Sequence, residues 1–230
     1  MTNPTLSIVM PTLNEEKAIA VVVKDIKKYG ADYDPEIIIV DSSTDRTPQI
    51  AEMLGCKVIK MPKCGPGKAI IAGLHASKGD VVIVSDCDNT YPMEAIPEFI
   101  GWYKQGYDFV NGSRLHKKQK AMPWFNWLGN RTFAFFVSIP FRIRTKDIAS
   151  GMRLYSRKLI NAETWETNYS FWIEIIVKTK KLGLKFKEIP IDYRPRIGEP
   201  TVNLFRSGRC FLLCILKYLF NIKAIDPAKL

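Results

Sequence analysis

The stretch VVIVSDCDNTYP, residues 81 to 92, decides what kind of fold to expect. Four β-branched, apolar residues and then Ser85 lead into Asp86, and a second carboxylate, Asp88, follows after a single Cys. In an extended chain, residues two apart point to the same side, so the two carboxylates are expected next to each other. Because two like charges at that spacing repel, we expect a positive group near the end of this strand.

Similar short apolar runs recur along the first half of the chain and alternate with helical patterns. Strands are expected at residues 6–10, 36–40, 57–60, 81–85 and 108–113, and helices at 15–29, 66–77, 93–103 and from a cap at Thr44 or Asp45 to Leu54. The strands are continuously apolar, which is typical of a sheet buried on both faces by parallel βαβ units. The sequence therefore predicts an α/β fold with a mostly parallel central sheet flanked by helices.

Polar, carboxylate-rich sequence follows three of these strands. The segments are PTLNE at 11–15, DSSTD at 41–45 and DCDN at 86–89. In open α/β sheets, ligands bind beyond the carboxyl ends of the strands. Three such ends meeting at one edge predict a binding site there.

Each of these motifs has a second interpretation. Asp86 and Asp88 suit a clamp for Mg²⁺ or Mn²⁺, which prefer oxygen ligands, but Asp and Asn are also common in solvated turns. Asp41 can accept hydrogen bonds from a base or ribose, or cap the next helix. Lys68 lies in CGPGKAI, a Gly-rich turn suited to phosphate, although the Walker A spacing is absent. The convergence of three strand ends favours the metal interpretation.

Composition limits the classes of partner. The 230 residues include 34 Lys and Arg against 23 Asp and Glu, a formal net charge of +11, which favours anionic partners. No zinc-ligand spacing and no aromatic RNP motif supports nucleic acid, so we expect none. Five Cys without a C-x-x-C indicate reduced thiols in a cytosolic setting. We expect no signal peptide, and no apolar run reaches the roughly 18 residues of a spanning helix.

Taken in order, the motifs resemble those of a family-two glycosyltransferase with the GT-A fold, in particular the dolichyl-phosphate mannose synthase-like, polyprenyl-phosphate branch. The matching segments, within about residues 6 to 200, are PTLNE, IIIVDSSTDRT, GPGKA, ASKGDVVIVSDCD, NGSR, DIASGMRLYSR and LGLKFKEIPIDYRPR. The resemblance implies an inverting enzyme that moves a hexose from a GDP- or UDP-sugar to a polyprenyl or dolichyl phosphate. It also implies Mg²⁺ or Mn²⁺ bound at the D-x-D pair.

The resemblance also implies roles for individual residues. The residues expected at the donor are Pro11, Thr12, Leu13, Glu15, Val40, Asp41, Lys68, Asp86, Cys87, Asp88 and Arg196. Arg196 belongs to the segment expected to close over the donor. The metal is expected at Asp86, Asp88 and Thr90, and the acceptor phosphate at Arg114, Asn130, Arg131, Ser150 and Arg153. The residues expected to act in catalysis are Asp86, Asp88, Arg114 and Arg131.

The chain departs from the family pattern at positions that bear on donor and acceptor choice. The paired Asp after the second strand is Asp41–Ser42, and the third metal position, often Gln, is Thr90. The helix that usually supplies Arg and Ser toward the acceptor has Asn126 and Asn130, which leaves Arg131 as the substitute.

The nature of the acceptor decides whether the enzyme needs a general base. A phosphate monoester already carries about −1.5 to −2 charges near neutrality, so it needs only cations to hold it, for which Arg114, Arg131 and Arg153 are candidates. A hydroxyl acceptor would need a base, and Asp147 or Glu174 would be the candidates. Otherwise these two are a loop-capping residue and a solvated helix position.

Two aromatic or apolar stretches bear on membrane contact. Residues 122–141 and 204–223 are too short to span a bilayer but have the pattern of interfacial helices flanked by basic residues. They could equally be core or dimer helices. We expect a glycosyltransferase domain at 1–203 and an amphipathic helix at 204–230 in the same compact unit, peripheral on the cytoplasmic face of a membrane. A membrane-anchored partner subunit stays open.

Three other functions are consistent with the sequence. A soluble transferase of similar fold would use a sugar or small phosphorylated acceptor and an Asp or Glu base. A sugar nucleotidyltransferase would form the nucleotide-sugar and release pyrophosphate. A non-catalytic binding module would show no metal-dependent turnover.

Overall fold

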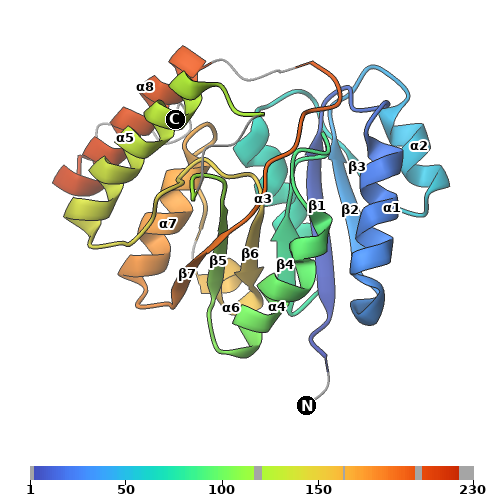
Figure 1. Cartoon of the computed structure of the whole chain (residues 1–230), viewed down its shortest axis with the longest axis horizontal. Coiled ribbons are helices and arrows are strands. Elements are labelled where there is room, and N and C mark those ends of the chain that lie inside the picture. The colour runs from blue at the N-terminus through green and yellow to red at the C-terminus, as the bar shows by residue number, and fades with distance from the viewer. Residues whose placement is uncertain (1–2, 117–120, 163, 200–203, 223–230) are drawn as a thin grey trace.

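The computed structural model describes residues 3–116, 121–162, 164–199 and 204–222, and its core is a seven-stranded sheet (Figure 1). The strand order is β3-β2-β1-β4-β6-β5-β7, and all neighbouring pairs are parallel except those made by β6. The mostly parallel sheet is therefore confirmed. The strands are β1 (Leu6–Thr12), β2 (Glu36–Asp41), β3 (Lys57–Lys60), β4 (Val81–Val84), β5 (Phe109–Ser113), β6 (Arg153–Ser156) and β7 (Phe186–Pro190).

Helices cover both faces of the sheet, as the continuously apolar strands predict. Alternate strand residues belong to two separate cores: Val9 and Val82 face α3, α6 and α7, whereas Ile8 and Ile83 face α1, α2 and α4. The helices are α1 (Ile19–Tyr29), α2 (Thr47–Met53), α3 (Pro66–Ala76), α4 (Ile96–Lys104), α5 (Trp124–Phe141), α6 (Arg157–Ala162), α7 (Phe171–Lys181) and α8 (Leu204–Phe220), with short 3₁₀ turns η1 (Ala31–Tyr33) and η2 (Met93–Ala95).

The start predicted for the first helix is wrong, because α1 begins at Ile19 rather than at residue 15 and residues 16–18 form a turn before it. The start of α2 at Thr47 agrees with the predicted cap at Asp45, which accepts a hydrogen bond from the Thr47 N–H (2.9 Å).

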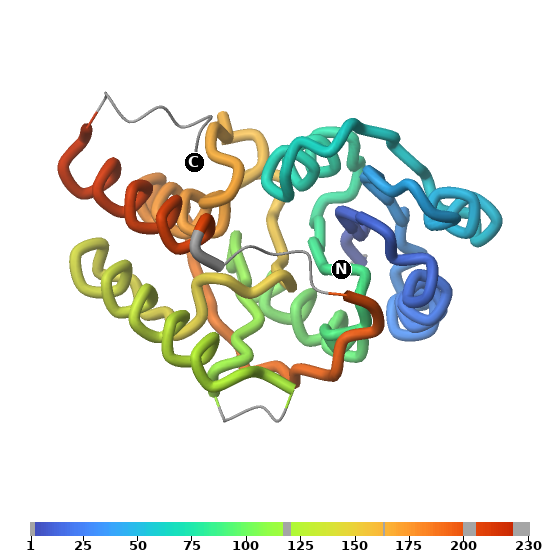
Figure 2. Tube along the Cα trace, turned by 90° about the horizontal axis from the view of Figure 1, so that it is seen from above, coloured from blue at the N-terminus to red at the C-terminus, as the bar shows by residue number. Residues whose placement is uncertain are grey.

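Helices α5 and α8 lie side by side at one end of the molecule (Figure 2). The rings of Phe133 and Phe211 meet edge to face between them, with centroids 5.6 Å apart. Lys217 of α8 forms an ion pair with Glu166 (3.1 Å), and the Tyr218 hydroxyl donates to Glu174 of α7 (3.3 Å). The division at residue 203 within one compact unit stays a prediction, and that boundary lies outside the described residues. None of the described helices is both long and apolar enough to cross a membrane.

Candidate active site

The carboxyl ends of β1 and β2 are tied together around Asp41. The Thr12 hydroxyl donates to the buried Asp41 carboxylate (2.8 Å), as do the hydroxyl (2.6 Å) and N–H (3.2 Å) of Ser43. In the same register, Pro11 lies beside Val40, and Leu13 follows directly. Asp41 therefore fixes the two turns, and capping of α2 falls to Asp45.

The positive group expected beside the carboxylate pair is Arg196, which follows β7 in the chain. Its Nη1 donates to Asp88 Oδ2 (2.7 Å) and its Nη2 to Glu15 Oε1 (2.5 Å). The backbone supports this contact, because the Ile197 N–H donates to the Asp88 carbonyl (2.9 Å). Strand ends β1 and β4 are thus joined by one guanidinium.

Two carboxyl groups at this edge ionise less readily than usual. Burial raises the pKa of Glu15 to about 7 against the attraction of Arg196, and the nearby charges of Asp88 and Asp86 raise it further. Burial and the charge of Asp88 likewise raise the pKa of Asp86 to about 7. Burial also raises the pKa of the Cys87 thiol, which keeps it neutral. The charges of Arg114, Arg196 and Arg153 thus do not offset the burial and mutual repulsion of these carboxylates, and such an environment favours an added cation.

The two aspartates have different surroundings, because β4 ends at Val84 and the chain bends after it. The prediction that both project from an extended strand is therefore wrong. Asp88 is buried and accepts hydrogen bonds from the N–H (3.0 Å) and hydroxyl of Thr90. Asp86 accepts no hydrogen bond from the described residues and packs directly on Gly151, where a Cβ would lie 2.4 Å from its Oδ2. Asp86 thus keeps oxygens available for a ligand.

The Gly-rich turn that carries Lys68 is held by a residue that the sequence did not indicate, Asn168. Its amide donates to the Cys64 carbonyl (2.6 Å) and accepts from the Lys68 N–H (3.2 Å). A Cβ on Gly67 would lie 2.2 Å from the Asn168 carbonyl oxygen, so only glycine fits there. Lys68 is exposed at the start of α3. No local pattern marks Asn168, because it lies 100 residues away in the chain.

Two of the arginines expected at the acceptor phosphate already have partners. The buried Arg114 forms a two-pronged ion pair with Asp147, with both distances 2.8 Å. Arg153 is buried and donates to the carbonyls of Ile148 (2.6 Å) and Trp172 (3.1 Å). The prediction that they bind phosphate therefore requires these contacts to be shared or released.

The remaining acceptor residues divide between a buried loop and an exposed helix. Ser150 is buried, and its hydroxyl accepts from the Met152 N–H (3.3 Å). Asn130 and Arg131 lie on α5, where the exposed Arg131 guanidinium stacks over the Trp127 ring, 5.0 Å from its centroid. Their role at the acceptor stays a prediction.

Both candidate bases are held as ion-paired carboxylates. Although burial raises the pKa of Asp147, the charge and hydrogen bonds of Arg114 bring it below its ordinary value. Burial also raises the pKa of Glu174, and hydrogen bonds from Thr167 and Lys178 lower it overall. The interpretation of Glu174 as a solvated helix position is wrong, because it is fully buried. Neither carboxylate is suited to accept a proton.

Within the described part of the chain, no three His, Cys, Asp or Glu side chains form a closed metal site. An open pair of carboxylates is still the arrangement that Mg²⁺ commonly uses together with substrate phosphates. The Asp86 carboxylate, which accepts no hydrogen bond from the described residues, and the raised pKa values of Glu15 and Asp86 fit such a cation.

The fold matches solved structures of GT-A glycosyltransferases. Glucosyl-3-phosphoglycerate synthase from Mycobacterium tuberculosis, solved with phosphoglyceric acid, superposes with a TM-score of 0.77 at 24% identity, covering 96% of this chain and 82% of that one. A second structure of that synthase, with Mn²⁺, UDP-glucose and phosphoglyceric acid, gives 0.78 over 96% and 81%. The chain thus has the GT-A fold.

The chain belongs to glycosyl transferase family 2, whose model matches residues 7–163. It is 38% identical to a dolichyl-phosphate hexose transferase of Haloferax volcanii, over 92% of each chain. It is also 35% identical to the low-salt glycan biosynthesis hexosyltransferase Agl6 of the same organism, over 95% of this chain and 55% of that one. The protein is therefore a glycosyltransferase, as the motifs indicate.

Proposed function

We propose that the protein transfers a hexose from a nucleotide-diphospho-sugar to a polyprenyl phosphate at a membrane surface, with inversion and with a divalent cation. The observation that carries the proposal is an apolar surface of α5 and α8 on a chain that also has the carboxylate-rich strand ends of a donor site. The resemblance to a dolichyl-phosphate hexose transferase supports the lipid acceptor.

On the donor side, Asp86 and Asp88 would hold Mg²⁺ or Mn²⁺, and Thr90 would orient Asp88 by its hydrogen bonds. The cation would neutralise charge on the diphosphate leaving group. Asp41, with Thr12 and Ser43 fixing its carboxylate, would meet the nucleoside at the adjacent strand ends.

Arg196 is suited to exchange partners when the donor binds. Its forked guanidinium matches phosphate oxygens as well as the two carboxylates that it contacts here. A donor diphosphate and its cation would replace Arg196 as the charge partner of Asp88, and Arg196 would then pair with the diphosphate. The segment around Arg196 would in this way cover the bound donor.

On the acceptor side, a phosphate needs no deprotonation, which agrees with the engaged state of Asp147 and Glu174. The favoured acceptor is therefore a phosphate rather than a sugar hydroxyl. Arg131 is the exposed cation among the predicted acceptor residues and would attract that phosphate.

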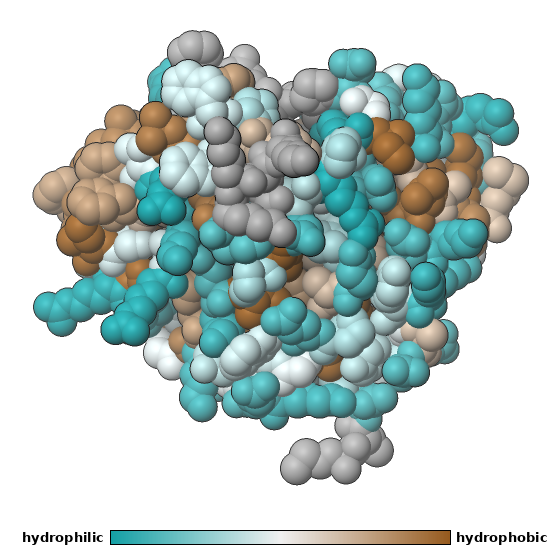
Figure 3. Space-filling view, viewed as in Figure 1, coloured by the Kyte–Doolittle hydropathy of each residue, from teal (hydrophilic) through white to brown (hydrophobic). Residues whose placement is uncertain are grey.

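The α5–α8 apolar face supports a lipid-linked acceptor (Figure 3). Nine of the twelve exposed large hydrophobic side chains among the described residues lie on these helices: Trp124, Phe125, Leu128, Phe135, Phe136, Ile139, Leu212, Leu219 and Phe220. We use the name for these nine residues. Such a concentration of exposed apolar side chains marks a docking surface. Arg131 lies between Leu128 and Phe135 on α5, so a lipid phosphate at this face would meet a cation.

The test is release of nucleoside diphosphate from a panel of UDP- and GDP-sugars with Mn²⁺ or Mg²⁺, with and without vesicles that contain a polyprenyl phosphate. We expect turnover of one donor that depends on the lipid and falls at least about a hundredfold in Asp88→Ala. Asp32→Ala, at an exposed site, is the matched control. Turnover with a small phosphorylated acceptor alone would favour the soluble transferase, and release of pyrophosphate would favour the nucleotidyltransferase.

A further inference from the structure

A basic groove lies beside the C-terminal end of α5, and none of the residues predicted at the donor or the acceptor lines it. Its volume is about 930 Å³. Its walls are the end of α5, the loop 142–146, His116 after β5 and the residues Glu188–Pro190 of β7. We call this space the Arg142 groove.

The loop that lines the groove is fixed by its own hydrogen bonds. Arg142 ends α5 in the left-handed region (φ 52°), and the Ile143 N–H donates to the Ser138 carbonyl (3.0 Å). The Ser138 hydroxyl donates to the Thr145 carbonyl (2.9 Å). Because the backbone is held in this way, the positions of the loop's side chains are fixed.

The loop places three cations at the groove. Arg142, Arg144 and Lys146 are exposed, whereas the residues between them, Ile143 and Thr145, are buried at 5% and 7% exposure. All three line the Arg142 groove. No ion pair found among the described residues involves any of the three. Arg142 alone could be explained by the negative end of the helix dipole, but Arg144 and Lys146 lie beyond the last turn.

The one carboxylate that lines the groove, Glu188, is already engaged. It accepts hydrogen bonds from the Thr145 hydroxyl (2.5 Å), the Lys146 N–H (3.0 Å) and the Asn111 amide (3.2 Å). These bonds occupy the Glu188 carboxylate, and none of them comes from the side chains of the three cations. The groove as a whole favours an anion.

The groove adjoins the α5–α8 apolar face. Ile139 lines the groove and, at 61% exposure, also belongs to that face. If the apolar face enters a membrane, the groove lies where phosphate headgroups are found, next to buried apolar side chains. A soluble phosphate ligand would not explain this adjacency.

We propose that the Arg142 groove binds the phosphate of an anionic phospholipid headgroup and so sets the orientation of the protein on the membrane. The inference rests on the membrane contact of the proposed function. It adds a site that is separate from the donor and acceptor residues named above. Because Arg and Lys near an anionic surface attract it additively, binding should weaken steeply with salt.

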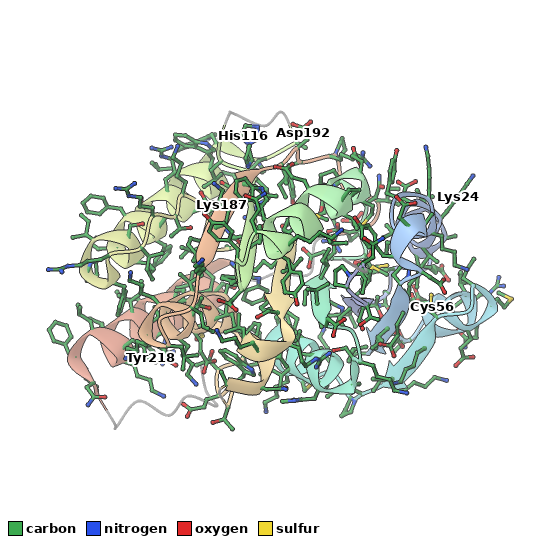
Figure 4. All side chains as sticks on the ribbon, turned by 90° about the horizontal axis from the view of Figure 1, so that it is seen from below. Lys24, Cys56, His116, Lys187, Asp192 and Tyr218 are labelled. Atoms are coloured by element: carbon green, nitrogen blue, oxygen red, sulfur yellow. The ribbon has the colours of Figure 1, made fainter. Side chains whose placement is uncertain are left out.

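The experiment is vesicle flotation with phosphatidylcholine alone and with phosphatidylcholine mixed with phosphatidylglycerol. The test variant is Arg142→Asn with Arg144→Gln and Lys146→Gln, since Asn tolerates the left-handed backbone. The control removes the same charge at exposed sites elsewhere, with Lys17→Gln, Lys24→Gln and Lys78→Gln. Figure 4 shows Lys24 at the opposite end of the molecule from Tyr218 of α8. A second variant, Arg144→Gln with Lys146→Gln, keeps Arg142 and so leaves the end of α5 unchanged, which guards against a folding defect.

We expect the test variant to lose at least about tenfold in affinity for the anionic vesicles, and the control less than about threefold. Binding to neutral vesicles and turnover with detergent-solubilised acceptor should not change. Equal losses of affinity in the test variant and the control would mean that net charge alone causes the effect, and would overturn the proposal. Tight binding of inorganic phosphate by wild type, abolished in the test variant, would also overturn it, because the ligand would then be a soluble phosphate. If wild type binds neither vesicle, the membrane part of the proposed function fails as well.

Discussion

Replacing Asp147 by Asn tests the buried charges beside the predicted acceptor site. Arg114 is buried, at 7% exposure of the residue, and its guanidinium donates twice to Asp147, at 2.8 Å each. The Asp147 carboxylate also accepts from the backbone N–H groups of Arg114 (3.0 Å) and Ala149 (3.2 Å). In Asp147→Asn the side chain keeps its size, but its NH2 group would face an N–H group of Arg114. Two donors would then meet, and neither would find an acceptor there. The guanidinium would stay buried without a counter-charge.

The size of the effect follows from the burial of both partners. Breaking a buried pair by removing one charge costs about 3–5 kcal/mol. For a chain of this size, that corresponds to a fall of about 10 °C in Tm, at roughly 2–4 °C per kcal/mol. Asp32→Asn, at an exposed site, should change stability by less than about 0.5 kcal/mol. Urea unfolding at neutral pH measures both variants.

The stability that the Arg114–Asp147 pair contributes should depend on pH. Burial opposes ionisation of Asp147, but Arg114 holds its pKa below the ordinary value. The contribution of the pair is therefore present above the ordinary pKa of an Asp and is lost as the pH falls through the lower folded value. The difference between wild type and Asp147→Asn should accordingly shrink in acid. A variant as stable as wild type at pH 7 would refute this description of the pair.

Turnover by Asp147→Asn separates the two acceptor classes. With a phosphate acceptor no base is needed, so the folded variant should keep activity within about tenfold when assayed well below its Tm. Removal of a general base typically costs about 10²–10⁴-fold. A loss of that size in fully folded protein would make Asp147 a base and the acceptor a hydroxyl.

Three further changes follow from the structure. Gly151→Ala would place a Cβ 2.4 Å from an aspartate oxygen of the metal pair and should lower donor turnover at least about tenfold, whereas Gly101→Ala, with no atom within 4 Å, should not. The pKa of Glu15 in the folded protein is about 7, above the usual 4.5, so its contribution to stability is full below pH 4.5 and is lost as the pH rises to 7. Without metal, Glu15→Gln should reduce this dependence of the free energy of unfolding on pH by up to about 3 kcal/mol, as measured by urea unfolding. Phe135→Ser should weaken binding to neutral vesicles by about tenfold without lowering Tm, whereas Met53→Ser, at an even more exposed position on α2, should leave vesicle binding unchanged.

The sheet was predictable because its signals are local. The continuous apolar run at residues 81–84 and the polar residues after it are visible in the sequence, and alternate residues such as Ile8 and Val9 do face opposite cores. The antiparallel β6 was not predicted. Its pairing with β4 and β5 is set by tertiary contacts rather than by its own four residues.

Individual residues of the candidate site could be named from the sequence, but not which of them contact each other. The carboxylates at the strand ends and Arg196 were identified, yet nothing local states that Arg196 contacts Glu15, 181 residues earlier. The pairing of Arg114 with Asp147 was missed for the same reason, since it joins two loops 33 residues apart. Burial also separates residues that look alike in sequence: Arg131 is exposed, whereas Arg153 is enclosed by backbone carbonyls.

The most direct test of the central claim is identification of the product. Purified protein would be incubated with the preferred nucleotide-sugar, Mn²⁺ and a polyprenyl phosphate in vesicles, and the extracted lipid analysed by mass spectrometry. We predict a polyprenyl phosphate that carries one hexose, formed by wild type and absent with Asp88→Ala. Donor consumption with the sugar found only on a water-soluble phosphorylated acceptor would contradict the claim.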